Sequence, residues 1–401
     1  MGNINYGQKM NAISSLFCCD DMEMRQMLFR SQAYYLHNVR FVFFDYKGSN
    51  IDSTFDAIPL QGHEDDYEKF HLYGLGDYTQ ALLIDCKHAM PGILSAYSAS
   101  KTAHLDLNIL SDIYHLLANK NIRIDTECFK NYLNYLKKNQ FSMDAQHATL
   151  ERVATLTHSD ELEFKETIKY FCLFQKMPIG VFSPNSVSLT NEETIVIENF
   201  INERLQCKTS NFQKYCAICC LIDKAYLLKK DKSIKSKKQR VEELVKYAIY
   251  ELTCNMENEL YLLSKYLLDE QSVVPFFHKL NKKTNIIKNI RNTAWDMFQL
   301  RLLEEDMATN NCTDFNKLHF PFFATHDQGL SMVIEMNPIR CIALYENKCI
   351  PFHKYSLQDT LKSYTYIVRS ALFQQDRDEK ALNTDYEKIR KALEDSITAS
   401  V

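Results

Sequence analysis

Carboxylates that border apolar runs are the side chains in this sequence best suited to chemistry. There are four of them: Asp106, Glu151, Asp296 and Asp327. Asp106 lies within the apolar run His104–Leu110, which we expect to form a β-strand. Burying a carboxylate in such a strand is costly unless the group is paired or binds a metal ion. Asn108, two residues further along, points to the same side if the strand continues.

Asp327 follows a second apolar run in a similar way. The run Phe320–Ala324 is typical of a buried strand, and it leads into the turn formed by Thr325, His326 and Asp327. In parallel α/β sheets, ligands bind beyond the carboxyl ends of the strands. We therefore expect Asp106 and Asp327 to lie at the same edge of one sheet.

Helices are expected to position the other two acids. Asp296 lies in the first turns of a helix predicted over Arg291–Met307, and Glu151 lies one turn into another predicted helix. Three or four convergent carboxylates bind hard divalent cations, and oxygen ligands suit Mg²⁺ or Mn²⁺. Such a site can activate a water molecule and stabilise in-line displacement at a phosphate. Taken singly, each acid also has a structural explanation in a solvated helix or a turn.

Positive charge close to these acids favours a phosphate-containing partner. The segment Lys279–Arg291 leads directly into the helix of Asp296. Its residues predicted to contact substrate are Lys282, Lys283, Lys288 and Arg291. A second basic segment, Lys229–Arg240, is better explained as a solvated linker between helices. Because the net charge is only −4, nucleic-acid binding would have to come from such local patches.

Composition limits the class of protein. At 401 residues the chain is long enough for two or three domains, and its 9 glycines and 8 prolines favour a helix-rich fold with few tight hairpins. No glycine-rich phosphate loop occurs. The 13 cysteines, without a secretion signal or a long apolar window, indicate free thiols in a reducing compartment. We therefore expect a cytoplasmic protein that does not engage a membrane.

Two other features have ordinary structural explanations. Cys216 and Cys219 form a CxxC pair, but no second pair follows at zinc-site spacing, and the helical pattern around them favours a buried helix face. Trp295, the only tryptophan, is predicted to lie in the core, with base stacking as the alternative. His326 lies within the Thr-His-Asp turn, where it could approach a phosphate.

Four short windows, between about residues 102 and 335, resemble the motifs of PIN-like nucleases. HLDLNILSDIY is similar to the family's opening strand and helix, in which Asn, Ser or Thr follows an Asp by two residues. ATLER, around Glu151, resembles the helix that bears the second acid. RNTAWDMFQLRLL resembles the third motif, around Asp296, and FFATHDQGL resembles the fourth, a strand followed by Thr-x-Asp. The acids also occur in the family's order.

The resemblance implies a metal-dependent endonuclease that hydrolyses phosphodiester bonds, with RNA favoured over DNA. The catalytic set would be Asp106, Glu151, Asp296 and Asp327. Asp106, Asp296 and Asp327 would hold one or two Mg²⁺ or Mn²⁺ ions, while Asn108 and Thr325 orient ligands or substrate. Glu161 and Glu163 are rivals of Glu151 for the second acid, and Asp112 could also face the site.

The implied fold is an α/β protein with a PIN-like parallel sheet flanked by helices. Strands expected at Val39–Tyr46 and Ala81–Cys86 suggest an N-terminal α/β extension over residues 1–100. Residues 101–345 would form the nuclease core, with a helical insertion at about 165–285, and residues 346–401 a C-terminal helical segment. The N-terminal part could bind a protein partner or regulator. The alternative function is a non-catalytic α/β and helical scaffold that binds a protein partner.

Overall fold

The computed structural model is a mixed α/β protein that is rich in helices, as the sequence predicts. It describes residues 6–19, 21–45, 70–78, 81–86, 98–122, 124–156, 160–206, 210–282, 284–313, 317–345, 348–372, 380 and 383–400. Contacts divide the chain into two compact units. Unit 1 comprises Met1–Ile201, Leu302–Asp327 and Pro338–Lys354, and unit 2 comprises Asn202–Arg301, Gln328–Asn337 and Tyr355–Val401.

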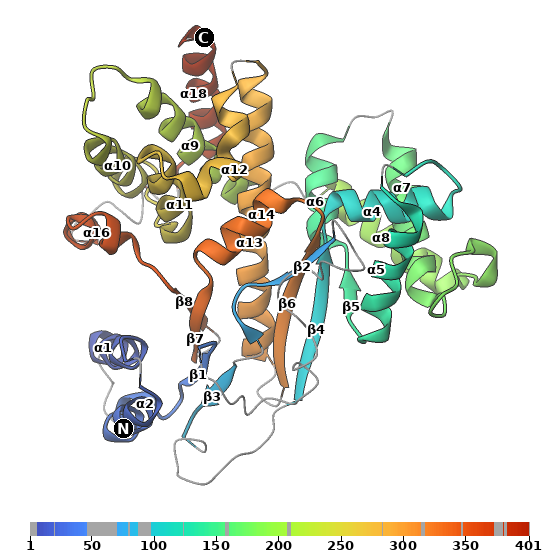
Figure 1. The fold of residues 1–401 in the computed structure, drawn as a ribbon, viewed down its shortest axis with the longest axis horizontal. Helices are drawn as coiled ribbons and strands as arrows, with labels where there is room; N and C mark the ends of the chain where they lie inside the picture. The colour runs from blue at the N-terminus through green and yellow to red at the C-terminus, as the bar shows by residue number, and fades with distance from the viewer. Residues whose placement is uncertain are drawn as a thin grey trace. The chain divides into compact units, whose positions relative to one another are not determined.

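Unit 1 contains a mixed sheet whose three parallel strands are central to the candidate site. Its strands, in spatial order, are β2 (His71–Gly74), β6 (Lys317–Thr325), β4 (Ser98–Leu105) and β5 (Ser142–Asp144). β4 runs parallel to both β5 and β6, whereas β2 is antiparallel to β6 (Figure 1). The longest pairing joins β4 to β6 and sets Leu105 opposite Ala324. The carboxyl ends of these two strands therefore lie side by side.

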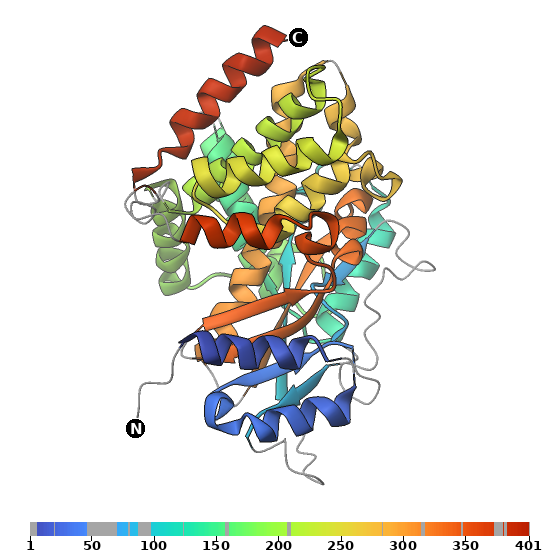
Figure 2. The ribbon, with the colours of Figure 1, turned by 90° about the vertical axis from the view of Figure 1, so that its left-hand side faces the viewer.

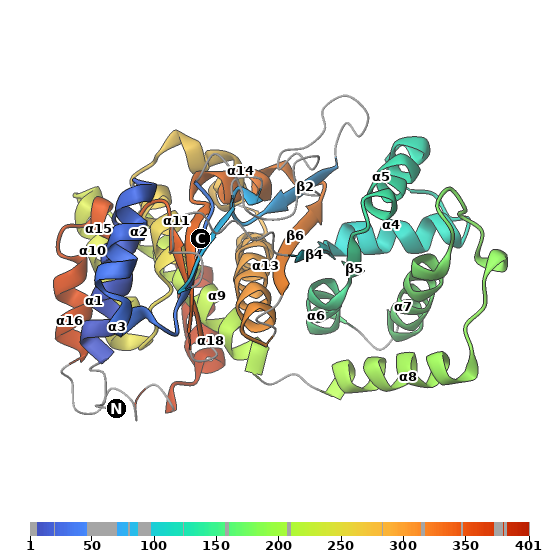
Figure 3. The same ribbon diagram turned by 90° about the horizontal axis from the view of Figure 1, so that it is seen from below.

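Helices cover this mixed sheet. They are α4 (Leu107–Leu117), α5 (Thr126–Lys138), α6 (Gln146–Thr155) and α7 (Glu161–Lys176) (Figure 3). α4 buries Ile109, Leu110, Ile113 and Leu117, which recur at helical spacing on one face. It packs against α6 and α7, and α6 also contacts β4. A 3₁₀ turn at Pro184–Ser186 precedes α8 (Asn191–Gln206).

A second, antiparallel sheet completes unit 1. Its spatial order is β3 (Leu82–Ile84), β1 (Arg40–Phe43), β7 (Ile339–Tyr345) and β8 (Lys348–His353). The N-terminal helices α1 (Tyr6–Phe17), α2 (Met22–Ser31) and α3 (Ala33–Leu36) pack on it (Figure 2). Ile13 and Phe29 from these helices meet Phe41 and Phe43 of β1 in one buried cluster. Residues from both ends of the chain thus share this core.

Unit 2 is helical. Its elements are α9 (Ser210–Lys230), α10 (Lys237–Lys246), a π-helical turn (Tyr247–Glu251), α11 (Glu257–Leu267), α12 (Val274–Phe277), α14 (Gln328–Met336), α15 (Leu357–Thr360), α16 (Tyr364–Leu372) and α18 (Tyr386–Ser400), with 3₁₀ turns at Gln271–Val273 and His278–Asn281. α18 packs against α9 (Figure 1). The long helix α13 (Ile286–Thr313) belongs to unit 2 as far as Arg301 and to unit 1 from Leu302.

Burial in unit 2 confirms two of the structural predictions. Trp295 lies in the core, where its ring stacks on Tyr215 with 4.2 Å between centroids. Cys216 and Cys219 are buried on one helix, α9, as free thiols. Within the described part of the chain, no helix is both long enough and apolar enough to cross a membrane.

The predicted strand His104–Leu110 is wrong at its end. β4 stops at Leu105, and Asn108 lies in the first turn of α4. A short apolar run suits a strand and a buried helix equally well, so the pattern could not locate the boundary. The division of the chain also differs from the expected one, because β1, β2 and β3 of the first 100 residues belong to the same unit as β4 and β6.

Candidate functional site

The carboxyl ends of β4 and β6 lie side by side, and the connections to the two neighbours of β4 run to opposite sides of that strand. From β4 the chain crosses to β5 on one side, and it later enters β6 on the other side. Open α/β sheets bind ligands at such a topological switch point, beyond the carboxyl ends of the strands. The first residue after β4 is Asp106, and the two residues after β6 are His326 and Asp327. The sequence prediction that both aspartates lie at one edge is consistent with this register.

Asp106 is held by side chains from two elements. Its Oδ2 accepts a hydrogen bond from Thr325 Oγ1 at 2.9 Å and another from Asn108 Nδ2 at 3.2 Å. Asp106 occupies the N-cap position of α4, yet its side chain makes no capping hydrogen bond. Its backbone N–H continues the ladder by donating to Ala324 O at 2.9 Å. The carboxylate is therefore fixed toward the strand ends rather than used to cap its own helix.

Thr325 couples the two aspartates. Its hydroxyl donates to Asp106, and the same oxygen accepts the backbone N–H of Asp327 at 2.9 Å. Thr325 is fully buried, so this hydroxyl forms its hydrogen bonds within the protein. The bridge fixes the start of the turn after β6 against the carboxylate that follows β4.

The surroundings of Asp106 raise the pKa of its carboxyl group. Burial raises the pKa of Asp106, and the nearby Asp327 carboxylate raises it further. The hydrogen bonds from Thr325 and Asn108, and the adjacent His326, oppose this rise without cancelling it. A carboxylate whose pKa is raised by a neighbouring carboxylate gains free energy when a cation binds beside it.

Asp112 and His326 extend the polar surroundings of this edge. Asp112 is buried on α4, and its Oδ2 lies 4.0 Å from His326 Nε2. The His326 ring also meets Phe70 edge-on, with 6.3 Å between centroids. Burial lowers the pKa of His71, and the nearby His326 contributes to the same shift. Two imidazoles, those of His71 and His326, therefore lie near the carboxyl end of β6.

The other predicted residues lie elsewhere. Glu151 is half-buried on α6, a helix that packs against α4 and β4. Its rivals Glu161 and Glu163 lie in the first turn of α7, where Glu163 pairs with Lys120 and Arg152 at 3.9 and 3.8 Å.

Asp296 and the basic residues belong to unit 2. Asp296 lies half-buried on α13, before the point where that helix enters unit 1. Lys282 and Lys288 are exposed, and Lys283 lies outside the described residues. Arg291 is engaged within unit 2 by Glu394 and by the fully buried Asp223. Its ion pairs compete with any contact to phosphate.

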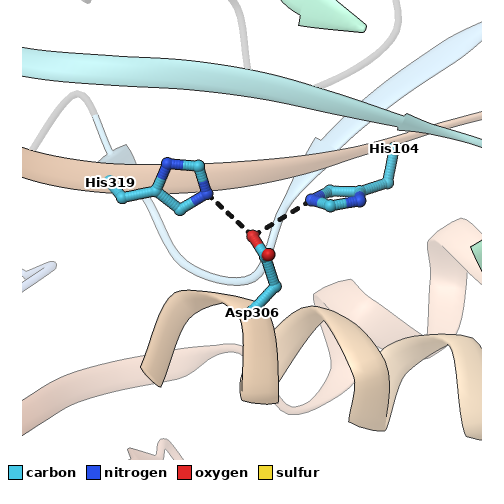
Figure 4. A group of neighbouring side chains, drawn as sticks. All are labelled: His104, Asp306 and His319. Atoms are coloured by element: carbon cyan, nitrogen blue, oxygen red, sulfur yellow. Dashed lines mark hydrogen bonds and ion pairs between the residues drawn. The ribbon is translucent and has the colours of Figure 1, made fainter. Parts of the chain in front are cut away.

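A second polar cluster, His104, Asp306 and His319, was not predicted. It lies on one face of the same sheet, where Asp306 of α13 accepts hydrogen bonds from His104 of β4 and His319 of β6 (Figure 4). The available sequence signal was one histidine in each of the two segments that form β4 and β6. To predict Asp306, one would have to know which face of the long helix α13 turns toward the sheet. The sequence pattern does not show this.

Comparisons with known proteins found no match for this chain. No protein-family model matches the chain, and neither the curated proteins nor the solved structures contain a significant match. The candidate site therefore stands on its own geometry.

Proposed function

We propose that unit 1 is a metal-dependent phosphodiesterase of PIN-like type, acting as an endonuclease with RNA favoured over DNA. The observation that carries the proposal is the pair Asp106 and Asp327, bridged by the Thr325 hydroxyl at the switch point of the sheet. The sequence windows with an Asp after each strand and a Thr two residues before the second Asp support the same family.

The donor set fits a hard divalent cation. Asp106 and Asp327 offer carboxylate oxygens, the ligands that Mg²⁺ and Mn²⁺ prefer. Thr325 and Asn108 both hold Oδ2 of Asp106, which fixes the direction in which its other oxygen can bind. Fixed outer partners of this kind orient metal ligands and are part of most metal sites. Asp296 belongs to unit 2 and is not part of this donor set.

The residues of the edge have distinct roles in the proposed reaction. A bound Mg²⁺ or Mn²⁺ would neutralise charge on a phosphate and lower the pKa of a water molecule. Asp106 and Asp327 would hold that cation, while the Thr325 hydroxyl fixes the Asp106 carboxylate against the backbone N–H of Asp327. Asp112 lies beside His326 and can hold its imidazole in place for a contact with substrate. Lys282 and Lys288 are the exposed positive charges proposed to contact the nucleic acid.

Cleavage of labelled single-stranded RNA and DNA in Mg²⁺, Mn²⁺ or EDTA tests this function. The wild-type protein should cut RNA only when a divalent cation is present, and Asp106→Asn should abolish the cleavage while the circular dichroism spectrum is retained. Asp125→Asn is the matched control. Asp125 is also an N-cap aspartate in unit 1, but it caps its own helix through Cys128 N at 2.8 Å. Cation-independent cleavage, or full activity in Asp106→Asn, would contradict the proposal.

A protein without any cleavage, but with a specific protein partner, would instead support the scaffold alternative. In that case Asp106→Asn should leave the affinity for the partner unchanged.

A further inference from the structure

We infer that His104, His319 and Asp306 form a second metal site, for a borderline first-row divalent ion such as Zn²⁺ or Fe²⁺. These residues come from three elements of unit 1: β4, β6 and α13. Their ligand atoms all lie within 4.8 Å of one another, the only such group found among the described residues. The inference is independent of the proposed nuclease function, because none of these side chains belongs to the carboxylate pair.

The three side chains converge on one point. His319 Nε2 lies 2.7 Å and His104 Nε2 lies 3.1 Å from the same oxygen, Oδ2 of Asp306 (Figure 4). An ion about 2.0–2.2 Å from each ligand holds neighbouring ligand atoms about 3 Å apart. The observed separations therefore need only small adjustments to admit an ion. Such an ion would take the place of the two protons with which the imidazoles donate to Asp306.

Outer polar contacts hold each ligand in a suitable orientation. His104 Nδ1 lies 3.0 Å from Asp144 Oδ2, and His319 Nδ1 lies 3.2 Å from Ser100 Oγ. Asn310 Nδ2 donates to the other carboxylate oxygen of Asp306 at 2.8 Å. Metal-binding histidines characteristically place their second ring nitrogen against a carboxylate or another oxygen, which fixes the tautomer. Here both histidines do so, and both leave Nε2 for the shared centre.

The type of ion follows from the donor set. Two imidazoles and one carboxylate suit Zn²⁺ and Fe²⁺, whereas Mg²⁺ favours oxygen ligands alone. The His104 side chain is only 2% exposed, but the Asp306 side chain is 24% exposed, so the centre opens toward solvent on the helix side. Three protein ligands with an open side leave at least one coordination position for water or another small ligand.

Metal uptake by the full-length protein, purified without a histidine tag, tests this inference. We expect about one equivalent of Zn²⁺ or Co²⁺ per chain, and visible d–d absorption from the Co²⁺ form that excess Mg²⁺ does not remove. His319→Gln and Asp306→Asn should each lose the Co²⁺ spectrum. Ser100→Ala changes only an outer contact, so it should fold normally and bind about 10–100-fold more weakly.

His353→Gln is the matched control. His353 of β8 also pairs with an acid of α13, because its Nε2 lies 3.1 Å from Glu304 Oε1, but among the described residues this pair is not part of a three-ligand group. This variant should bind Co²⁺ as the wild type does. Absence of stoichiometric uptake by the wild type, or equal affinity in a folded His319→Gln variant, would overturn the inference. Asp106→Asn should retain the Co²⁺ spectrum, which separates this site from the one proposed at the carboxyl edge.

Discussion

A single buried hydroxyl, that of Thr325, links the Asp106 carboxylate to the backbone of Asp327 in the proposed nuclease site. It donates to Asp106 and accepts from the N–H of Asp327, so both connections depend on the same oxygen. The substitution Thr325→Val tests the geometry of this edge with little change in shape, because valine has nearly the size of threonine but no hydroxyl.

Thr325→Val should lower the free energy of unfolding by about 1–3 kcal/mol, since it leaves buried polar groups without a partner. It should also slow cation-dependent cleavage, because Asp106 would then be oriented by Asn108 alone. Urea unfolding and a cleavage assay measure the two effects. Thr325→Ser, which keeps the hydroxyl, should stay close to the wild type in both. A valine variant that equals the wild type in stability and rate would show that the bridge is dispensable.

The sequence allowed the placement of some residues of the candidate sites to be predicted, but not that of others. Asp106 and Asp327 could be predicted because each follows an apolar run, and the ends of parallel strands share an edge. His104, Asp306 and His319 could not be assembled in this way. Their meeting depends on the register that sets Ser100 opposite His319, and on which face of α13 turns toward the sheet. Neither quantity is encoded in a local pattern.

Among the elements, the junction between α13 and β6 positions much of the sheet. Asn311 is fully buried near the end of the helix, and its side chain makes both hydrogen bonds of the His319 backbone: Nδ2 donates to His319 O at 2.7 Å and Oδ1 accepts from His319 N at 2.9 Å. The amide group thus substitutes for a neighbouring strand at the beginning of β6.

Asn311→Ala should cost about 2–4 kcal/mol of the free energy of unfolding, because it leaves a strand N–H and C=O without their partner. Thermal or denaturant unfolding measures the loss. Thr309→Ala, at an exposed position on the same helix, should change stability by no more than about 0.5 kcal/mol. Equal, small effects of the two substitutions would show that the junction contributes little.

Elements that coincide with clear apolar patterns were predicted better than those that do not. The helix expected over Arg291–Met307 exists as the longer α13, and the strand expected over Phe320–Ala324 exists as the longer β6. The strands β2, β5 and β8 were missed. β2 and β5 have only four and three residues, and pairing with β6 and β4 determines their conformation. Such tertiary pairing overrides weak local preference.

At the scale of the whole molecule, the N-terminal helices are part of unit 1 rather than a detachable extension. Arg25 of α2 is almost fully buried and binds both oxygens of Asp45 at 2.8 and 2.9 Å. Arg340 of β7 donates to the same carboxylate at 2.7 Å. One acid therefore ties the start of the chain to a strand from its last quarter.

Asp45→Asn should lower the free energy of unfolding by about 2 kcal/mol at pH 7, since it leaves the buried Arg25 without its counter-ion. Burial alone would raise the pKa of Asp45, but the hydrogen bonds from Arg25 and Arg340 outweigh it and hold that pKa below its usual value. The stabilisation is therefore present above the unfolded-state pKa and is lost as the pH falls through the lower, folded-state pKa.

The difference in stability between wild type and Asp45→Asn should accordingly shrink below about pH 4. Urea unfolding at a series of pH values gives this difference directly. A gap that stays constant down to the acid limit would mean that the ion pairs of Asp45 do not stabilise the fold.

The central claim is that Asp106 and Asp327 act together as one cation site. The most direct test is the Mg²⁺-dependent rate of RNA cleavage by the wild type, Asp106→Asn, Asp327→Asn and the double variant. Each single substitution should lower the rate by at least about 100-fold, and the double variant should be about as slow as the slower single variant, because groups that act as a unit are not additive. A wild type without Mg²⁺-dependent cleavage, a fully active single variant, or losses that multiply in the double variant would contradict the claim.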